Sequence, residues 1–283
     1  MKRRGAELTF FWLMRLVTYA IVVVIAYIIF DIVYKGLPAI SWEFLTGFPQ
    51  RSGAEGGILP AIVGTLSLVF GSIIVALPLG MASAIYLSEY ATQGRFTRAI
   101  RLAIITLAGV PSIVFGLFGL GLFVLFLDFG ASIISGSLTL ACMILPTIIV
   151  SSEEALKAVP QTLREGSLAL GATKWQTIYK NVLPYSFSGM LTGSILGIGR
   201  AAGETAPILL TVAAFYLPKL PKSIFDQVMA LPYHLYILAT QHPEAEAVRP
   251  MQYGTALVLI ALVLGVNMFA ILLRSRFRRK YRW

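Results

Sequence analysis

Long apolar stretches alternate with short polar segments along this chain of 283 residues. Six of the stretches are long enough to cross the hydrocarbon core of a membrane, which takes about 20 residues in a helix. They are Leu16–Tyr34, Ile58–Leu87, Leu102–Leu127, Phe129–Val150, Tyr185–Phe215 and Met251–Leu273. An open strand would leave its backbone groups without partners in lipid. The pattern therefore predicts an all-α integral membrane protein with six transmembrane helices.

The composition supports this assignment. Hydrophobic residues make up 57% of the chain and charged residues only 13%, whereas soluble domains contain about 25% charged residues. These proportions exclude an ordinary soluble or secreted protein.

One polar segment, residues 161–184, has the pattern of two short helices. It contains two capping boxes, the reciprocal pairs of hydrogen bonds that start a helix. These are Thr162 with Glu165 and Thr173 with Gln176. Gly171 lies where a left-handed residue would end the first helix, and Pro184 forbids simple continuation of the second. We therefore expect a helix, a glycine turn and a second helix, forming a structure that another protein can bind.

The basic residues divide unequally between the two sides that six crossings create. Seventeen Lys and Arg residues fall on the side of both termini and of segment 161–184, and five fall on the other side. Cytoplasmic loops collect Lys and Arg, so both termini and this segment are predicted to be cytoplasmic. Topology and attraction to anionic lipid explain the net charge of +10. We therefore expect no nucleic-acid partner.

The fifth stretch contains two charges in apolar surroundings, Arg200 and Glu204. On a helix this spacing places both side chains on one face. Counted from Tyr185, Arg200 lies about 22 Å along the helix, around or just beyond the midplane of a membrane. A charge at this depth must face protein, a partner charge or water. Gly203 and Pro207 are predicted to loosen or kink the helix there.

Two roles remain open for this pair. One is a structural ion pair that fixes the helix bundle. The other is an anion site, in which Arg200 meets the substrate and Glu204 holds Arg200 when the site is empty; we include the adjacent Thr205 in this predicted pathway. A guanidinium suits a tetrahedral oxyanion because it donates two parallel hydrogen bonds. A structural pair is replaceable by apolar residues at little cost, which favours the anion site.

Motifs of several enzyme classes are missing from the sequence. It contains no GxxxxGK[ST] phosphate loop, no GxSxG nucleophile elbow and no HExxH zinc motif. His234 and His242 lie in the loop 216–250 without a partner set at motif spacing. Cys142 is the single cysteine, which excludes an intramolecular disulfide or a multi-cysteine metal site. We therefore expect no catalysis, no metal and no cofactor in this chain.

Two further expectations concern the polar parts of the chain. The loop 216–250 is predicted to hold a short helix around Ile224–Thr240. Charges at the ends of the apolar stretches, among them Asp31 and Glu89, are expected to be solvated.

Segment 161–184 resembles the signature loop of the permease subunits of ABC importers. That signature reads Glu-Ala-Ala, three residues, Gly, and about ten residues later a branched residue before Leu-Pro. Glu165, Gly171 and the pair Leu183-Pro184 match it. Gly166 and Ser167 replace the two alanines, and Asn181 stands at the branched position. The resemblance implies that this loop, including Thr162, Thr173 and Trp175, couples the chain to an ATPase.

Four further stretches are similar to the phosphate permeases of this family. They are Gly56–Leu66, Val110–Leu120, Arg200–Leu209 and Met229–Thr240. The resemblance implies a type I ABC importer permease in the cytoplasmic (inner) membrane of a bacterium or archaeon. Its implied partners are a second, similar permease, two ATPase subunits that bind ATP, and an external phosphate-binding protein. It also implies that Arg200 takes part in the passage of phosphate.

In this reading the chain has two parts. Residues 1–56 form the first transmembrane helix and an outer loop. Residues 57–283 form a five-helix permease core that includes the cytoplasmic coupling loop 153–184.

Other functions stay open on the sequence alone. A permease for sulfate, molybdate or phosphonate is the alternative within the family, because an arginine does not select among oxyanions. A stand-alone secondary anion carrier would explain Arg200 and leave segment 161–184 without a purpose. A noncatalytic membrane scaffold would explain that segment and leave Arg200 without one.

Overall fold

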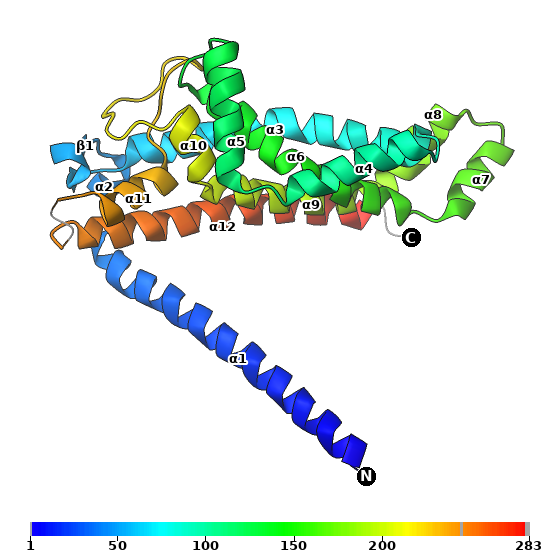
Figure 1. Ribbon diagram of the computed structural model, residues 1–283, viewed down its shortest axis with the longest axis horizontal. Helices are drawn as coiled ribbons and strands as arrows, with labels where there is room; N and C mark the ends of the chain where they lie inside the picture. Colours follow the sequence, from blue (N-terminus) through cyan, green and yellow to red (C-terminus); the bar gives the residue numbers. More distant parts are fainter. Residues whose placement is uncertain (1, 244–245, 281–283) are drawn as a thin grey trace.

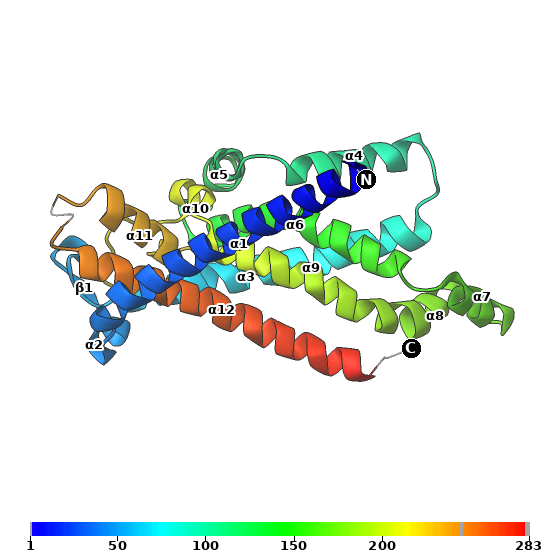
Figure 2. The ribbon, with the colours of Figure 1, turned by 90° about the horizontal axis from the view of Figure 1, so that it is seen from below.

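The structure is a computed structural model that describes residues 2–243 and 246–280. Five helices in this part of the chain are long and apolar enough to cross a membrane. They are α1 (Lys2–Gly36), α3 (Leu59–Ile85), α6 (Ile133–Lys157), α9 (Leu183–Gly203) and α12 (Arg249–Lys280). All except α1 lie side by side in one bundle (Figures 1 and 2). Arg282, one of the seventeen basic residues assigned to the cytoplasmic side, lies outside the described residues.

The third apolar stretch is helical as predicted, but it is bent into two parts. It forms α4 (Arg95–Ala108) and α5 (Ser112–Gly119), which continues into the π-helical segment η4 (Leu120–Phe126). The two parts are bent by 105°. Pro111 causes the break, because it disfavours helical backbone at the preceding residue and has no N–H to donate.

The bent pair still crosses the membrane, because α3 and α6 run parallel to each other. Gly71 of α3 lies against Ser137 of α6, and Gly80, further along α3, lies against Ile148. Two parallel neighbours need a return crossing between them, and residues 91–132 are the chain that joins them. With this crossing the described residues span the membrane six times.

The centre of the bundle is α6, which packs between α3 and α9. Its side chains Leu140, Ile144 and Ile148 are buried. Gly193 of α9 approaches α6 so closely that a Cβ atom there would collide with Ser151. Small residues permit such close contact, and membrane helices depend on it because lipid supplies no hydrophobic driving force between them.

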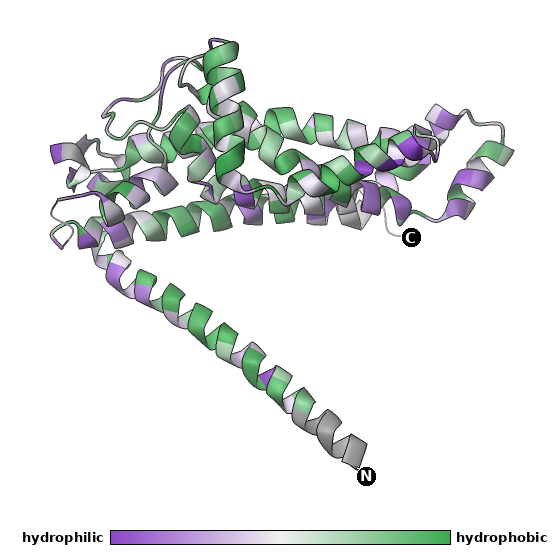
Figure 3. Ribbon diagram, viewed as in Figure 1, coloured by the Kyte–Doolittle hydropathy of each residue, from purple (hydrophilic) through white to green (hydrophobic). Residues whose placement is uncertain are grey.

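Helix α1 leaves the bundle at an angle (Figure 1). The C-terminal end of α1 meets the first turns of α12, where Gly36 lies against Tyr253. Most of its apolar side chains are exposed from Phe10 onward. Figure 3 shows hydrophobic residues along the middle of the long helices and hydrophilic residues at both ends of the bundle.

One end of the bundle carries the small elements of the predicted outer side. They are η1 (Leu37–Ala39), α2 (Trp42–Thr46), the hairpin of β1 (Pro49–Gln50) and β2 (Glu55–Gly56) with η2 (Arg51–Gly53) between its strands, and α11 (Leu231–Thr240). The helix predicted around Ile224–Thr240 therefore begins seven residues later, with Pro232 in its first turn. The backbone N–H of Leu231 donates to Thr65 Oγ1 at 2.8 Å, which fixes this outer layer to α3.

The other end carries α7 (Gln161–Ala169) and α8 (Lys174–Thr177). Helix α8 continues through the π-helical segment η5 (Ile178–Val182) directly into α9. The prediction that Pro184 forbids simple continuation of the second helix is thus confirmed only in part, because the chain stays helical but passes through the π-helical η5 just before Pro184. Pro184 lies in the first turn of α9, where the missing N–H is tolerated.

Candidate substrate pathway and coupling loop

The fifth apolar stretch forms two helices joined by a break. Helix α9 ends at Gly203, and α10 (Ala206–Thr211) follows with Pro207 in its first turn. Glu204, between them, has an extended backbone with φ −76° and ψ 136°. The interruption predicted from Gly203 and Pro207 is confirmed. Arg200 and Glu204 do not share one helix as predicted, because Glu204 lies just past the end of α9.

The two charges nevertheless form an ion pair. Arg200 Nε donates to Glu204 Oε1 at 3.2 Å. The side chain of Arg200 is 38% exposed and that of Glu204 is 17% exposed. The guanidinium is thus not sealed among apolar side chains but reaches the surface of this chain.

This surface lies inside the membrane. Thr192, nine residues into α9, accepts a hydrogen bond at 3.0 Å from Arg274, which lies near the cytoplasmic end of α12. Arg200 lies eight residues further along, or about 12 Å, which is close to the midplane of a hydrocarbon core about 30 Å thick. A charge at this depth requires protein or water beside it.

Thr205 completes the break and is half-buried, with its carbonyl accepting the N–H of Leu209 at 3.0 Å. A cavity of about 10 Å³ lies beside Glu204, among Thr65, Ala201 and Pro232. It has room for about one water molecule. An oxyanion is larger, so the exposed side of Arg200 is the accessible side of this site.

Segment 161–184 of the predicted coupling loop 153–184 has the predicted helix–turn–helix form, and the name coupling loop refers to this segment below. Gly171 has a left-handed backbone with φ +83°. Its N–H donates to Leu168 O at 2.9 Å and that of Ala172 donates to Ser167 O at 3.2 Å. These two bonds form a Schellman motif, which ends α7.

Only one of the two predicted capping boxes is present in this loop. Thr173 and Gln176 exchange the expected hydrogen bonds at 2.9 and 3.2 Å and start α8. Thr162 and Glu165 do not, because α7 begins at Gln161 after Pro160 and makes no side-chain cap. Proline fixes a backbone angle suited to a helix start, so the helix begins before Thr162.

The two departures from the signature loop are bonded to each other. Asn181 Nδ2 donates to Ser167 Oγ at 2.9 Å, and Ser167 Oγ lies 3.0 Å from Thr177 Oγ1. These polar contacts join α7 to the last residue of α8 and to the segment η5. The sequence did not predict this contact, because Ser167 and Asn181 are 14 positions apart and no local pattern relates residues at that spacing.

Large apolar side chains are exposed on the outer surface of the coupling loop. Leu170, at the turn, is 90% exposed. Trp175 and Tyr179 stack with their ring centroids 6.1 Å apart and are also exposed. Exposed apolar groups beside a polar rim mark a surface for another protein.

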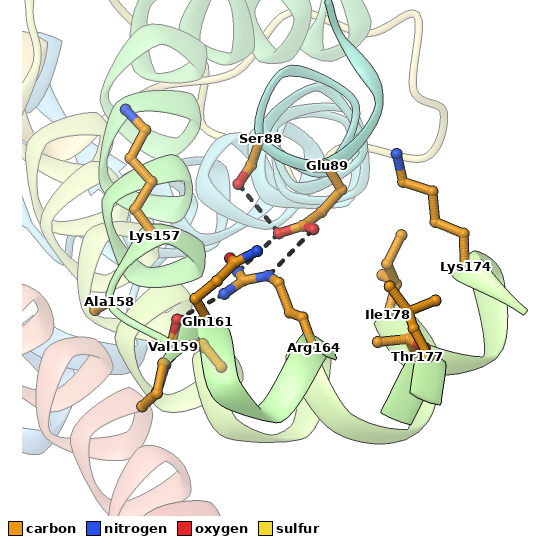
Figure 4. A pocket seen from close by; sticks show the side chains of 12 residues that line it. Ser88, Glu89, Lys157, Ala158, Val159, Gln161, Arg164, Lys174, Thr177 and Ile178 are labelled. Carbon is orange, nitrogen blue, oxygen red and sulfur yellow. Dashed lines mark hydrogen bonds and ion pairs between the residues drawn. The ribbon is translucent and has the colours of Figure 1, made fainter. Parts of the chain in front are cut away.

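The inner side of the loop is held to the bundle by an ion pair that the sequence did not reveal. Arg164 of α7 contacts Glu89 of η3 (Tyr86–Tyr90), the π-helical end of α3, at 2.9 Å (Figure 4). The expectation that Glu89 is solvated was wrong, since this side chain is 9% exposed. The two residues are 75 positions apart, so no helical or loop spacing relates them. Asp31, also expected to be solvated, pairs with Lys35 at 2.7 Å.

Comparison with known proteins assigns the family. A family described as "Binding-protein-dependent transport system inner membrane component" matches residues 76–283. This chain belongs to that family. It is a multi-pass inner-membrane permease, as its six crossings and apolar helices indicate.

Other proteins of similar sequence carry transport permease names. "Phosphate transport system permease protein PstA 1" of Mycobacterium tuberculosis (strain ATCC 25618 / H37Rv) is 39% identical over 80% of this chain and 72% of its own length. "Probable phosphate transport system permease protein PstA" of Methanocaldococcus jannaschii is 35% identical over 91% of this chain and 89% of its own. "Probable ABC transporter permease protein YqgI" of Bacillus subtilis (strain 168) is 34% identical over 84% and 85%.

Solved permeases of ABC importers share the fold. The bacterial alginate ABC transporter, solved with a pentasaccharide-bound periplasmic protein, superimposes with a TM-score of 0.66 over 92% of each chain at 15% identity. The MetNI methionine ABC transporter, in an inward-facing form, gives 0.60 over 78% of this chain and 94% of that one at 16% identity. The predicted type I ABC importer architecture is thereby confirmed.

Proposed function

We propose that this binding-protein-dependent permease is one of two permease subunits of an ATP-driven phosphate importer. The observation that most supports this proposal is the partly exposed ion pair of Arg200 and Glu204, which lies at a helix break near the membrane midplane. The phosphate names of its relatives support the choice of anion.

The second permease follows from the exposure of Arg200. The cavity on the buried side of the pair holds about one water, so a passage for phosphate runs along the opposite, exposed side. A neighbouring permease would close that side against lipid and complete an aqueous path. This role also separates the site from a structural ion pair, which would be buried within the bundle.

The chemistry of the pair suits reversible binding of an anion. The guanidinium offers parallel N–H groups that match two oxygens of a phosphate. When no anion is present, the Glu204 carboxylate forms an ion pair with this guanidinium, and the same carboxylate repels an anion that approaches. This competition weakens binding, and a substrate that must leave the site needs weak binding.

The coupling loop is the proposed contact with the ATPase. Its predicted contact residues lie on α7, at the turn and on α8. They are Thr162, Glu165, Gly171, Thr173 and Trp175, with Pro184 at the base of the loop. In this proposal the ATPase subunits bind and hydrolyse ATP, this chain is non-catalytic, and an external phosphate-binding protein delivers the substrate. Closure of the ATPase pair would move α7 and α8 and change the side to which Arg200 is open.

Reconstitution tests the function directly. The complete assembly is placed in liposomes, and ATP-dependent entry of phosphate is compared with that of sulfate. We expect phosphate entry that is lost in Arg200→Glu, while the ATPase still co-purifies; Arg98→Glu, a reversal at an exposed arginine of α4, serves as the matched control. Preferred sulfate entry would transfer the assignment to another oxyanion. Normal phosphate entry by Arg200→Glu would contradict the pathway.

A further inference from the structure

Arg164 joins three elements at the cytoplasmic end of the bundle. Its Nη2 donates to Glu89 Oε1 at 2.9 Å and its Nε donates to Glu89 Oε2 at 3.4 Å. Its Nη2 also donates to Leu156 O at 2.8 Å, and its Nη1 donates to Val159 O at 2.6 Å. One side chain of α7 therefore holds the end of α3, a carbonyl in the last turn of α6 and a carbonyl just after α6.

Burial makes this contact strong. The side chains of Arg164 and Glu89 are 14% and 9% exposed. A forked guanidinium–carboxylate contact is charge-assisted and fixes both distance and orientation. Removing one partner would leave the other charge buried without compensation.

A second arginine, on α4, holds the same turn of α3. Arg101 of α4 donates through Nη2 to Leu87 O at 2.8 Å, and the same nitrogen lies 2.8 Å from Glu153 Oε1 of α6. The segment η3 is thus fixed to α4, α6 and α7 at once. Displacement of η3 would move the cytoplasmic ends of all three.

A cavity of about 640 Å³ lies beside Arg164 and separates part of the coupling loop from the bundle (Figure 4). Lys157 and Lys174 line it from opposite sides, with Thr177 and Ile178 on the side of the loop. On the side of this cavity the loop is not packed against the bundle, whereas Leu163 of α7 packs against the apolar cluster that includes Ala84 and Leu156. A movement of α7 therefore reaches the end of α3 through the ion pair of Arg164, beside the packing of Leu163 and the contact of Lys174 Nζ with the Tyr90 ring at 5.0 Å.

We propose that Glu89 and Arg164 form a positioning pair that transmits movement of the coupling loop to α3 and α6. The inference rests on the proposed function, because it assumes an ATPase that moves α7. Without the pair, α7 would move within the cavity while α3 stayed in place. ATP would then be hydrolysed without a matching movement of the substrate pathway.

The test uses the complete reconstituted assembly with Glu89→Gln and, separately, Arg164→Lys. Glutamine keeps the shape of Glu89 without its charge, and lysine keeps the charge of Arg164 without the fork. We expect the ATPase to co-purify and to hydrolyse ATP in both variants. Substrate carried per ATP should fall by about tenfold, the scale expected when a residue in a coupling network is lost. Arg98→Gln is the matched control and should leave this ratio unchanged.

A second readout does not depend on the substrate. Spin labels at Gln93→Cys and Ala169→Cys, in an assembly otherwise free of cysteine, report the distance between the loop that follows η3 and the end of α7. We expect one narrow distance distribution in the parent and a broad one in Glu89→Gln. Unchanged substrate per ATP together with an unchanged distribution would overturn the inference, as would parallel loss of assembly, hydrolysis and transport. Absence of ATP-driven uptake in the parent would instead contradict the proposed function, while the label distances would still test the pair.

Discussion

His234 lies in α11 beneath the outer hairpin, with 3% of its surface exposed. Its Cε1 atom faces Gly53, which has a left-handed backbone with φ +94°. The Nε2 atom has no hydrogen-bond partner among the described residues. Burial lowers the pKa of His234 from 6.5 to about 4, because a charged imidazole would lose its hydration. The neutral form is therefore the one that fits beneath the hairpin.

This pKa predicts that acid loosens the outer layer. The stabilisation is complete above pH 6.5 and decreases as the pH falls toward 4, because only the opened chain gains a proton. Between pH 6.5 and 5 the free energy of opening of α11 should fall by about 2 kcal/mol. Hydrogen exchange of residues 231–240, corrected for the intrinsic rate, measures it. His234→Leu should lack the change and His242→Asn should keep it. The same pH dependence in His234→Leu would contradict the assignment.

At the scale of elements, the coupling loop depends on one backbone conformation. A Cβ atom on Gly171 would meet nothing within 4 Å, so its surroundings would accept a side chain. The backbone of Gly171 does not accept a side chain, because its φ is +83°. A left-handed backbone costs an L-residue roughly 1–2 kcal/mol, and it costs a β-branched residue more. The angle between α7 and α8 is therefore set by the glycine backbone.

Gly171→Val should change the shape of the loop while the membrane bundle stays intact. We expect a large loss of ATPase co-purification and of ATP-driven uptake, since the contact surface formed by α7 and α8 is no longer presented in one arrangement. Co-purification measured by mass spectrometry, together with uptake in liposomes, checks this. Gly171→Asn should be tolerated because asparagine adopts left-handed backbone more readily.

Gly166→Ala is the matched control within α7. A Cβ atom at Gly166 also meets nothing within 4 Å, and this residue is helical. Alanine there should strengthen the helix by about 1 kcal/mol. Wild-type coupling in Gly171→Val would exclude the turn as the element that sets the geometry.

The elements of this fold differ in how far the sequence predicts them. Apolar length located every long helix, and the capping box at Thr173 and the turn at Gly171 were readable because their partners are near in sequence. The bend at Pro111 was missed because apolar length does not report direction. The start of α7 directly after Pro160 was missed because the sequence contains two start signals there, the proline and the capping-box pattern at Thr162. The contact of Arg164 with Glu89 has no local signal and depends on the packing of the whole bundle.

At the scale of the molecule, the two ends of the bundle are chemically different. One end holds α7, α8 and the half-buried arginines Arg101 and Arg164, and the other holds the hairpin and α11 (Figure 1). Lys and Arg are far more numerous at the first end, which the positive-inside rule assigns to the cytoplasm. This assignment requires that the bent α4–α5 pair crosses the membrane, since otherwise every later segment would change sides.

Cysteine labelling in intact cells decides between these topologies. In a chain with Cys142→Ala, single cysteines replace three exposed residues: Gln93 before the bent pair, Ala169 after α6, and Ser223 in the outer loop. Six crossings place Gln93 and Ala169 in the cytoplasm and Ser223 outside, so a membrane-impermeant maleimide should label only Ser223→Cys until the cells are permeabilised. A bent pair that returned to its side of entry would place Ala169 opposite to Gln93. Labelling of Ala169→Cys in intact cells would therefore contradict both the sixth crossing and the cytoplasmic position of the coupling loop.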